Sequence, residues 1–345
     1  MKKINEYAPV QTSGILLNAN ESPFDFDRYI KEELVKLLSE FSFQRYPNDT
    51  YEELLKAYAN YAGIEEDQVI CGNGSDELLG LIIGLTITQG KKLLTFKKDF
   101  GMYNYYTSMF QGEVVTYDQP ITEDFDSAKF IETAKKENVA IIMISNPNNP
   151  TGKLIPVSSI KDILEGLKEI PVVIDEAYIE FSEEGSSMMP YLEDYPNLII
   201  TRTLSKAFGL ASIRCGFLAT NKERMATIKP NKVPFNVSTF SEKVATLLLN
   251  KIDFMKKKVS IIQAERDLLY KKVQQLSPTT FKLYPSQANF LYGEAKDKAS
   301  LIQAFKDKNI TIREYKDTTF RITIGTQEDN ALVYEVLKEY EVQHA

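Results

Sequence analysis

The chain of 345 residues contains one histidine, two cysteines and no tryptophan. The histidine, His344, is the penultimate residue, so we expect no Ser-His-Asp triad, no histidine general base and no histidine metal site. Cys71 and Cys215 are too few for the disulfide framework of a secreted domain or for a zinc site. The sequence therefore predicts chemistry that depends on Lys, Tyr, Asp, Arg or a cofactor, without a metal.

Long apolar runs and an excess of positive charge are also absent. No stretch approaches the roughly 20 apolar residues of a membrane span, and the polar residues 1–6 lack the apolar core of a signal peptide. The net charge of −7 does not favour non-specific binding to nucleic acid or to an anionic membrane. We therefore expect a cytoplasmic protein without nucleic-acid or membrane partners.

The length and the hydrophobic pattern predict two domains, because 345 residues exceed what one core usually fills. Alternating apolar strands and amphipathic helices in residues 41–240 predict an α/β domain with a mostly parallel, doubly wound sheet. Residues 241–345 predict a linker helix and a small α+β domain. We expect residues 1–40, an extended arm and a helix, to pack on that small domain.

The expected elements follow from hydrophobic periodicity and turn residues. Strands are expected at residues 68–71, 92–96, 113–117, 139–144, 172–178, 198–201, 288–292, 310–313 and 320–325. Helices are expected at residues 29–39, 51–61, 78–85, 102–110, 157–167, 240–275, 298–307 and 328–340. Thr50 and Glu53 have the spacing of a capping box at the second of these helices.

Lys206 follows a predicted buried strand and is flanked by Ser205, Ala207 and Phe208 instead of by charged residues. Partial burial would lower the pKa of its amine and make it a usable nucleophile. This pattern indicates a lysine that forms a Schiff base with pyridoxal phosphate. An ordinary lysine on a loop explains this stretch, taken alone, equally well.

Other candidate residues also lie at the C-terminal ends of predicted strands: Gly74, Asn149, Asp175 and Tyr178. The carboxyl ends of such strands meet at one edge of a sheet, which is where ligands bind. A buried Asp175 needs a cation, such as a protonated pyridine nitrogen, or it caps a loop. Asn149 and Tyr178 could bind the phenolate oxygen of the same ring, or they could serve a turn and the core.

The turn at residues 72–77 opens a predicted helix. Its backbone N–H groups and the helix dipole suit a phosphate, although Gly-Asn-Gly is also common in ordinary turns. Ser75, Thr203, Ser205 and Arg214 could complete a phosphate site. The sequence thus offers a cofactor site with an anion-binding end.

The chain as a whole resembles the histidinol-phosphate aminotransferases. The motifs that carry the resemblance occur in order: Asn-Ala-Asn-Glu at 18–21, Arg-Tyr-Pro at 45–47, Gly-Asn-Gly-Ser-Asp-Glu at 72–77, Asn-Pro-Asn-Asn-Pro-Thr-Gly at 146–152, Asp-Glu-Ala-Tyr-Ile-Glu-Phe at 175–181, Arg-Thr-Leu-Ser-Lys-Ala-Phe-Gly-Leu at 202–210, Asn-Val-Ser at 236–238, Ala-Asn-Phe at 288–290 and Arg-Ile-Thr-Ile-Gly-Thr at 321–326. The resemblance implies a fold-type I, pyridoxal-phosphate-dependent aminotransferase that is typically a homodimer.

The resemblance also implies roles for single residues. Lys206 would bind the cofactor covalently, Asp175 would contact the ring nitrogen, and Asn149 and Tyr178 would contact the phenolate oxygen. The residues implied at the cofactor phosphate are Gly74, Ser75, Asp76, Ser205 and Arg214. Tyr46 would reach the phosphate bound by the partner subunit, so each site would need the dimer.

Three residues are expected at the substrate. Arg321 matches the arginine that binds the anionic end of the substrate, Arg313 an additional substrate arginine, and Asn20 a further contact. One departure concerns the family's Pro-x-Tyr, which is Lys98-Asp99-Phe100 here. Phe100 keeps an aromatic face that can stack on the pyridine ring.

The implied reaction transfers the amino group of L-histidinol phosphate to 2-oxoglutarate, giving imidazole-acetol phosphate and glutamate, in histidine biosynthesis. Histidinol phosphate has no α-carboxylate, so Arg321 would bind the phosphate of one substrate and the α-carboxylate of the other. An aromatic amino acid aminotransferase and a phosphothreonine decarboxylase are alternatives with the same fold. A non-catalytic pyridoxal-phosphate sensor is disfavoured, because no basic extension precedes Asn18 and because Arg321 is present.

Overall fold

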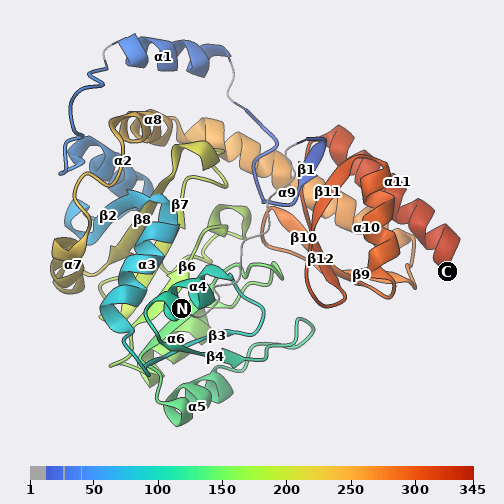
Figure 1. The fold of residues 1–345 in the computed structure, drawn as a ribbon, viewed down its shortest axis with the longest axis horizontal. Coiled ribbons are helices and arrows are strands. Elements are labelled where there is room, and N and C mark those ends of the chain that lie inside the picture. Colours follow the sequence, from blue (N-terminus) through green and yellow to red (C-terminus); the bar gives the residue numbers. More distant parts are fainter. Residues whose placement is uncertain (1–12, 26–27, 40) are drawn as a thin grey trace.

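The computed structural model describes residues 13–25, 28–39 and 41–345. The first twelve residues of the expected arm lie outside this description, as do residues 26, 27 and 40. The described residues form two β-sheets with helices packed against them (Figure 1). The α/β fold class predicted from the sequence is confirmed, whereas the exact division into domains stays a prediction.

The larger sheet has seven strands. Their spatial order is β2 (Val69–Asn73), β8 (Cys215–Thr220), β7 (Leu198–Thr203), β6 (Val172–Asp175), β5 (Ile141–Ser145), β3 (Lys92–Phe96) and β4 (Glu113–Tyr117). β8 runs antiparallel to both of its neighbours, and all other neighbouring pairs are parallel. Because side chains alternate along a strand, Met143 packs in one hydrophobic cluster and Ile144 in another. Both faces of this sheet are therefore covered.

Helices supply the two covering layers. One layer consists of α3 (Gly74–Thr86), α4 (Met102–Met109) and α7 (Lys222–Ile228). The opposite layer consists of α5 (Ser127–Glu137) and α6 (Val157–Gly166), with α2 (Glu52–Ala62) over β2 and β8. At that end the rings of Tyr58 and Phe217 stack with centroids 3.7 Å apart.

The smaller sheet has five strands in the order β1 (Ile15–Leu17), β11 (Ile310–Glu314), β12 (Thr319–Thr323), β10 (Phe290–Ala295) and β9 (Phe281–Leu283). It packs with α9 (Ile252–Gln275), α10 (Lys298–Asp307) and α11 (Gln327–His344). The N-terminal arm joins this sheet, because β1 pairs in parallel with β11. The helix α1 (Arg28–Ser39) instead contacts α8 (Thr239–Leu249), away from the small sheet (Figure 1). Among the described helices, none has the length and apolar character needed to cross a bilayer.

Several local predictions were wrong or incomplete. Residues 240–275 form two helices, α8 and α9, instead of one. The strands β1, β8 and β9 and the helices α5 and α7 were not predicted. Thr50 does not cap α2: Tyr51 precedes that helix with a positive φ of 50° and no side-chain cap. The Tyr51 hydroxyl bonds the backbone of Val237 at 3.1 Å, so a contact distant in sequence sets where α2 begins.

Single-turn 3-10 helices connect some of these elements. They are η1 (Glu66–Gln68), η2 (Ile179–Phe181), η3 (Met189–Tyr191), η4 (Ala211–Ile213) and η5 (Lys229–Asn231). The helix η1 leads directly into β2, and η4 ends one residue before Arg214, which precedes β8.

Gly216 on β8 touches the backbone at the start of α3. A Cβ atom at this position would lie 2.2 Å from the Ser75 nitrogen and 2.6 Å from the Gly74 carbonyl carbon. Since both are backbone atoms, the start of α3 would have to move. We expect Gly216→Ala to lower the free energy of unfolding by about 1–3 kcal/mol, measured by chemical denaturation. Gly101→Ala is the control, because a Cβ there meets no atom within 4 Å; equal losses in both variants would contradict the prediction.

Candidate active site

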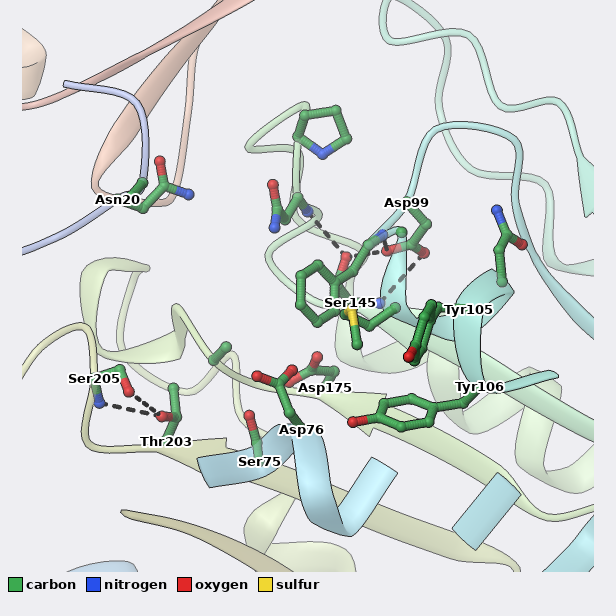
Figure 2. Close-up of a pocket in the computed structure, with 18 of the residues that line it drawn as sticks. Asn20, Ser75, Asp76, Asp99, Tyr105, Tyr106, Ser145, Asp175, Thr203 and Ser205 are labelled. Atoms are coloured by element: carbon green, nitrogen blue, oxygen red, sulfur yellow. Dashed lines mark hydrogen bonds between the residues drawn. The ribbon is translucent and has the colours of Figure 1, made fainter. Parts of the chain in front are cut away.

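A cavity of about 2280 Å³ is lined by residues from both sheets. This exceeds the roughly 300–1,000 Å³ of common ligand pockets, so a cofactor and a substrate can both fit. Most of the predicted site residues line it: Asn20, Ser75, Asp76, Phe100, Asn149, Asp175, Tyr178, Thr203, Ser205, Lys206, Arg214, Arg313 and Arg321. Figure 2 shows part of this wall.

Strand direction brings these residues together. β5, β6 and β7 are parallel, so Ser145, Asp175 and Thr203 end their strands at the same edge. β8 runs in the opposite direction, so its first residue lies at that edge, and Arg214 directly precedes it. Arg214, which precedes β8, and Asp175, which ends β6, thus line one cavity.

The Lys206 amine lies inside the cavity. Its Nζ donates a hydrogen bond to the Ala19 carbonyl oxygen at 2.8 Å and lies 5.9 Å from the ring centroid of Tyr178. Burial lowers the pKa of Lys206 to about 8, and the charge of Arg321 acts in the same direction. The amine therefore loses its proton more readily near neutral pH than an ordinary lysine does, and the deprotonated amine is the nucleophile.

Asp175 is buried, with 3% of its surface exposed. The Tyr103 hydroxyl donates to its Oδ2 at 2.9 Å, and Thr201 Oγ1 donates to its Oδ1 at 3.1 Å. Burial raises the pKa of Asp175 to about 6, while these two hydrogen bonds act in the opposite direction. The carboxylate is oriented by its donors and would be stabilised by a cationic ligand.

The Tyr178 hydroxyl accepts two hydrogen bonds. Asn20 Nδ2 donates at 2.9 Å and Asn149 Nδ2 at 3.4 Å. Neither contact uses the hydroxyl proton, which is left to point toward an acceptor. Burial raises the pKa of Tyr178 to about 12, so this proton is retained at neutral pH. Tyr178 and Asn149 are thus a pair of donors for a ligand oxygen.

The start of α3 forms an anion site with its neighbours. Gly74 has a positive φ of 77°, and a Cβ there would lie 2.5 Å from Arg214 Nη2; Gly74 itself does not line the cavity. Ser75 and Asp76 project from α3 beside Thr203 and Ser205 (Figure 2). In the same group, Arg214 Nη2 lies 3.3 Å from Asp76 Oδ2 and Thr203 Oγ1 donates to Ser205 Oγ at 2.9 Å. Hydroxyls, a guanidinium and a helix N-terminus together suit a phosphate.

Arg321 on β12 has a donor to spare. Its Nη2 donates to the Asn18 carbonyl oxygen at 2.8 Å and its Nη1 to Asn149 Oδ1. Its Nε is buried without a partner among the described residues. Arg313 pairs with Arg321 across β11 and β12 and also lines the cavity. Two guanidinium groups therefore offer a place for the anionic end of a ligand.

Tyr46 is, besides Gly74, the predicted site residue that does not line the cavity. It is 82% exposed, and its ring lies 5.1 Å from that of Phe235. Tyr103, by contrast, was not predicted from the sequence, and it lies three residues after Phe100 on the first turn of α4. Its ring contacts Phe100 edge-on at 5.7 Å. Because Phe100 precedes α4, helical spacing in the sequence did not point to this contact.

Comparisons with known proteins identify the family of this chain. The family described as aminotransferase class I and II matches residues 12–337. A histidinol-phosphate aminotransferase from Clostridium kluyveri is 37% identical over 323 residues, which are 92% of this chain and 91% of that protein. One from Clostridium novyi is 35% identical over 98% of this chain and 96% of its own length.

Solved structures share the fold of this chain. The histidinol-phosphate aminotransferase from Sinorhizobium meliloti in complex with pyridoxal-5′-phosphate superposes with a TM-score of 0.86 at 24% identity, covering 96% of this chain and 92% of that chain. The enzyme from Clostridium acetobutylicum superposes with a TM-score of 0.85 at 25% identity, covering 95% and 99%.

The reactivity of Lys206 should depend on its charged neighbours. In the cofactor-free protein, we expect acylation of Lys206 to rise with pH with a midpoint near 8, because burial and Arg321 lower its pKa and Glu21 raises it. Arg321→Gln should move the midpoint upward and Glu21→Gln downward. Mass spectrometry of the peptide containing Lys206 measures both shifts. A midpoint near the ordinary 10.5, or shifts of equal sign in the two variants, would contradict the assignment.

Proposed function

Because this chain belongs to the aminotransferase class I and II family and its relatives include histidinol-phosphate aminotransferases at 35% and 37% identity, we propose that it is a pyridoxal-phosphate-dependent histidinol-phosphate aminotransferase. It transfers the amino group of L-histidinol phosphate to 2-oxoglutarate, giving imidazole-acetol phosphate and glutamate, in histidine biosynthesis. The observation that carries the proposal is that Lys206, Asp175 and Arg321 line one cavity.

The residues present fit the cofactor. Pyridoxal phosphate supplies an aldehyde and a ring that withdraws electrons when its nitrogen is protonated. Lys206 would hold the aldehyde carbon, Asp175 the ring nitrogen, and Asn149 with Tyr178 the ring oxygen. Phe100 lies at the cavity wall and would cover the ring. The phosphate would be held by Gly74, Ser75, Asp76, Thr203, Ser205 and Arg214.

Lys206 also serves as the acid–base group. Its free amine takes the proton from the substrate carbon that carries the amino group and returns a proton later in the reaction. A pKa of about 8 suits this task, because a group that titrates near the working pH can both accept and release a proton. The low pKa and the position of Lys206 therefore support the same role.

Arg321 would bind the phosphate of histidinol phosphate and the carboxylate of 2-oxoglutarate in turn. The planar guanidinium matches both anions, and its unpartnered buried Nε supplies a further donor. Arg313 on the neighbouring strand adds positive charge at the same end, and Asn20 would complete this end of the site.

We also propose that the enzyme is a homodimer whose partner completes the site. Tyr46, Phe43, Val233 and Phe235 are large apolar or aromatic residues that are between 47% and 82% exposed. Exposed apolar residues that gather on one surface are typical of an interface. From there, Tyr46 would reach the cofactor phosphate of the partner subunit. The cytoplasmic location stays a prediction.

The reaction can be followed through the absorbance of the bound cofactor. Histidinol phosphate should abolish the absorbance band of the covalently bound cofactor, and 2-oxoglutarate should restore it. Lys206→Ala should still bind the cofactor, without the covalent bond, and lose turnover by about 10³-fold or more, as expected for a lost acid–base group.

The absorbance scan and an assay of released carbon dioxide together separate the alternatives. A response to phenylalanine and not to histidinol phosphate would identify an aromatic aminotransferase, and carbon dioxide released from phosphothreonine would identify a decarboxylase. Full turnover by Lys206→Ala would refute the role of this amine.

Mixing two inactive variants tests the shared site. Tyr46→Ala and Lys206→Ala subunits, unfolded and refolded together, should form hybrids in which one of the two sites has both residues. Activity should recover to about a quarter of that of the wild type, given random assembly of twofold dimers. Each variant refolded alone is the control. Absence of recovery, with dimers present by sedimentation, would exclude a site that uses Tyr46 of the partner.

A further inference from the structure

We propose that Asp99 is a positioning residue, which fixes Asn149 through the Ser145 hydroxyl and thereby sets the donor to the cofactor's ring oxygen. The inference rests on the proposed function, because it assigns that ring oxygen to Asn149. Asp99 lines the cavity, yet neither the cofactor contacts nor the substrate contacts proposed for this site use it.

Hydrogen-bond donors surround the Asp99 carboxylate. Its Oδ1 accepts from the Phe100 nitrogen at 2.8 Å and, at short range, from Ser145 Oγ. Its Oδ2 accepts from Thr95 Oγ1 at 3.2 Å and from the Ser145 nitrogen at 3.4 Å. Burial raises the pKa of Asp99 to about 7, while these donors act in the opposite direction. No lysine or arginine forms an ion pair with it in the described part of the chain, so hydrogen bonds alone hold this carboxylate.

Asp99 determines the direction of the Ser145 hydroxyl. Ser145 is buried, and because its proton goes to Asp99, its oxygen is left to accept hydrogen bonds. In the loop that directly follows Ser145, it accepts from the Asn149 nitrogen at 2.9 Å and from Asn148 Nδ2 at 3.3 Å. Figure 2 shows Asp99 and Ser145 above Asp175, with dashed lines that mark hydrogen bonds. Without Asp99 the hydroxyl would be free to rotate, and the Asn149 N–H would lose its defined acceptor.

The side chain of Asn149 connects this series of hydrogen bonds to the residues proposed for the cofactor and for the substrate. Its Oδ1 accepts from Arg321 Nη1, and its Nδ2 donates to the Tyr178 hydroxyl at 3.4 Å. The amide thus presents its donor to Tyr178, with which it would hold the cofactor's ring oxygen, and its acceptor to Arg321. Displacing the Asn149 backbone would disturb both, although Asp99 itself touches neither group.

The spectrum of the holoenzyme provides a test other than activity. A donor to the ring oxygen favours the deprotonated chromophore, so a weaker donor raises the pH at which the chromophore loses its proton. We expect Asp99→Ala and Ser145→Ala each to raise this midpoint by about one pH unit, on the scale of a lost oriented hydrogen bond. The double variant should shift no further than either single one, because both changes break one chain. Asp99→Asn, which keeps an acceptor for Ser145, should shift the midpoint less than Asp99→Ala.

Controls separate positioning from loss of fold. Asp118→Asn is the matched control, because Asp118 is an exposed aspartate that pairs with Lys97 at 2.7 Å, and its midpoint should equal that of the wild type. Circular dichroism checks the fold of each variant. Unchanged midpoints in folded Asp99→Ala and Ser145→Ala, or additive shifts in the double variant, would overturn the inference. The midpoint needs only bound cofactor, so it remains a valid test if histidinol phosphate proves not to be the substrate.

Discussion

The side chain of Asn20 joins the two sheets, and the cavity depends on this contact. Asn20 Nδ2 donates to the Tyr178 hydroxyl beyond β6, while Thr323 Oγ1 of β12 donates to Asn20 Oδ1 at 3.1 Å and accepts from its backbone nitrogen at 3.0 Å. Asn289 Nδ2 donates to the Asn20 carbonyl oxygen at 3.1 Å. The residue has a positive φ of 55°, a conformation that asparagine tolerates better than most residues. The arm is thereby fixed as a wall of the site, and it offers the Ala19 carbonyl to Lys206.

The charges in the cavity are poorly compensated in the protein alone. Burial raises the pKa of Asp175 to about 6, so protonation of this carboxyl favours the folded state. This contribution to the free energy of unfolding is complete below the usual pKa of an aspartate and is lost as the pH rises through about 6. Lys206 has a lowered pKa, so folding becomes more favourable as the pH rises from about 8 toward the ordinary value. A ligand with a cationic ring nitrogen, an aldehyde and an anionic group would relieve both penalties. Binding free energy and folding free energy are linked in this way.

The residues that the sequence could identify are those whose place depends on strand order. Asp175 and Lys206 could be predicted at one edge because each follows an apolar run, and β3 and β4 have the predicted bounds. The partners that tune the buried carboxylates could not, because Tyr103 and Ser145 reach Asp175 and Asp99 across 72 and 46 residues of sequence. β8 was not predicted as a strand. A short apolar run also does not indicate strand direction, and the antiparallel course of β8 is what explains the place of Arg214. Thr50 was wrongly assigned as a cap because local spacing could not reveal the contact of Tyr51 with Val237.

Residues 98–100 are Lys-Asp-Phe where the resembled family has Pro-x-Tyr. This segment illustrates how a loop can be held in place without a proline. Lys98 Nζ reaches the small sheet, lying 2.8 Å from Asp317 Oδ2 and 2.8 Å from the Tyr292 hydroxyl, and its carbonyl accepts from Asn148 Nδ2 at 3.2 Å. Asp99 faces the opposite way, toward Ser145, while Phe100 stands at the cavity wall. A proline restricts a loop through its own ring, whereas here three side chains restrict it through three different neighbours. The loop that covers the ring is therefore coupled to the small sheet, to Asn149 and to the helix that carries Tyr103, so a change at any of these contacts would reach the cofactor.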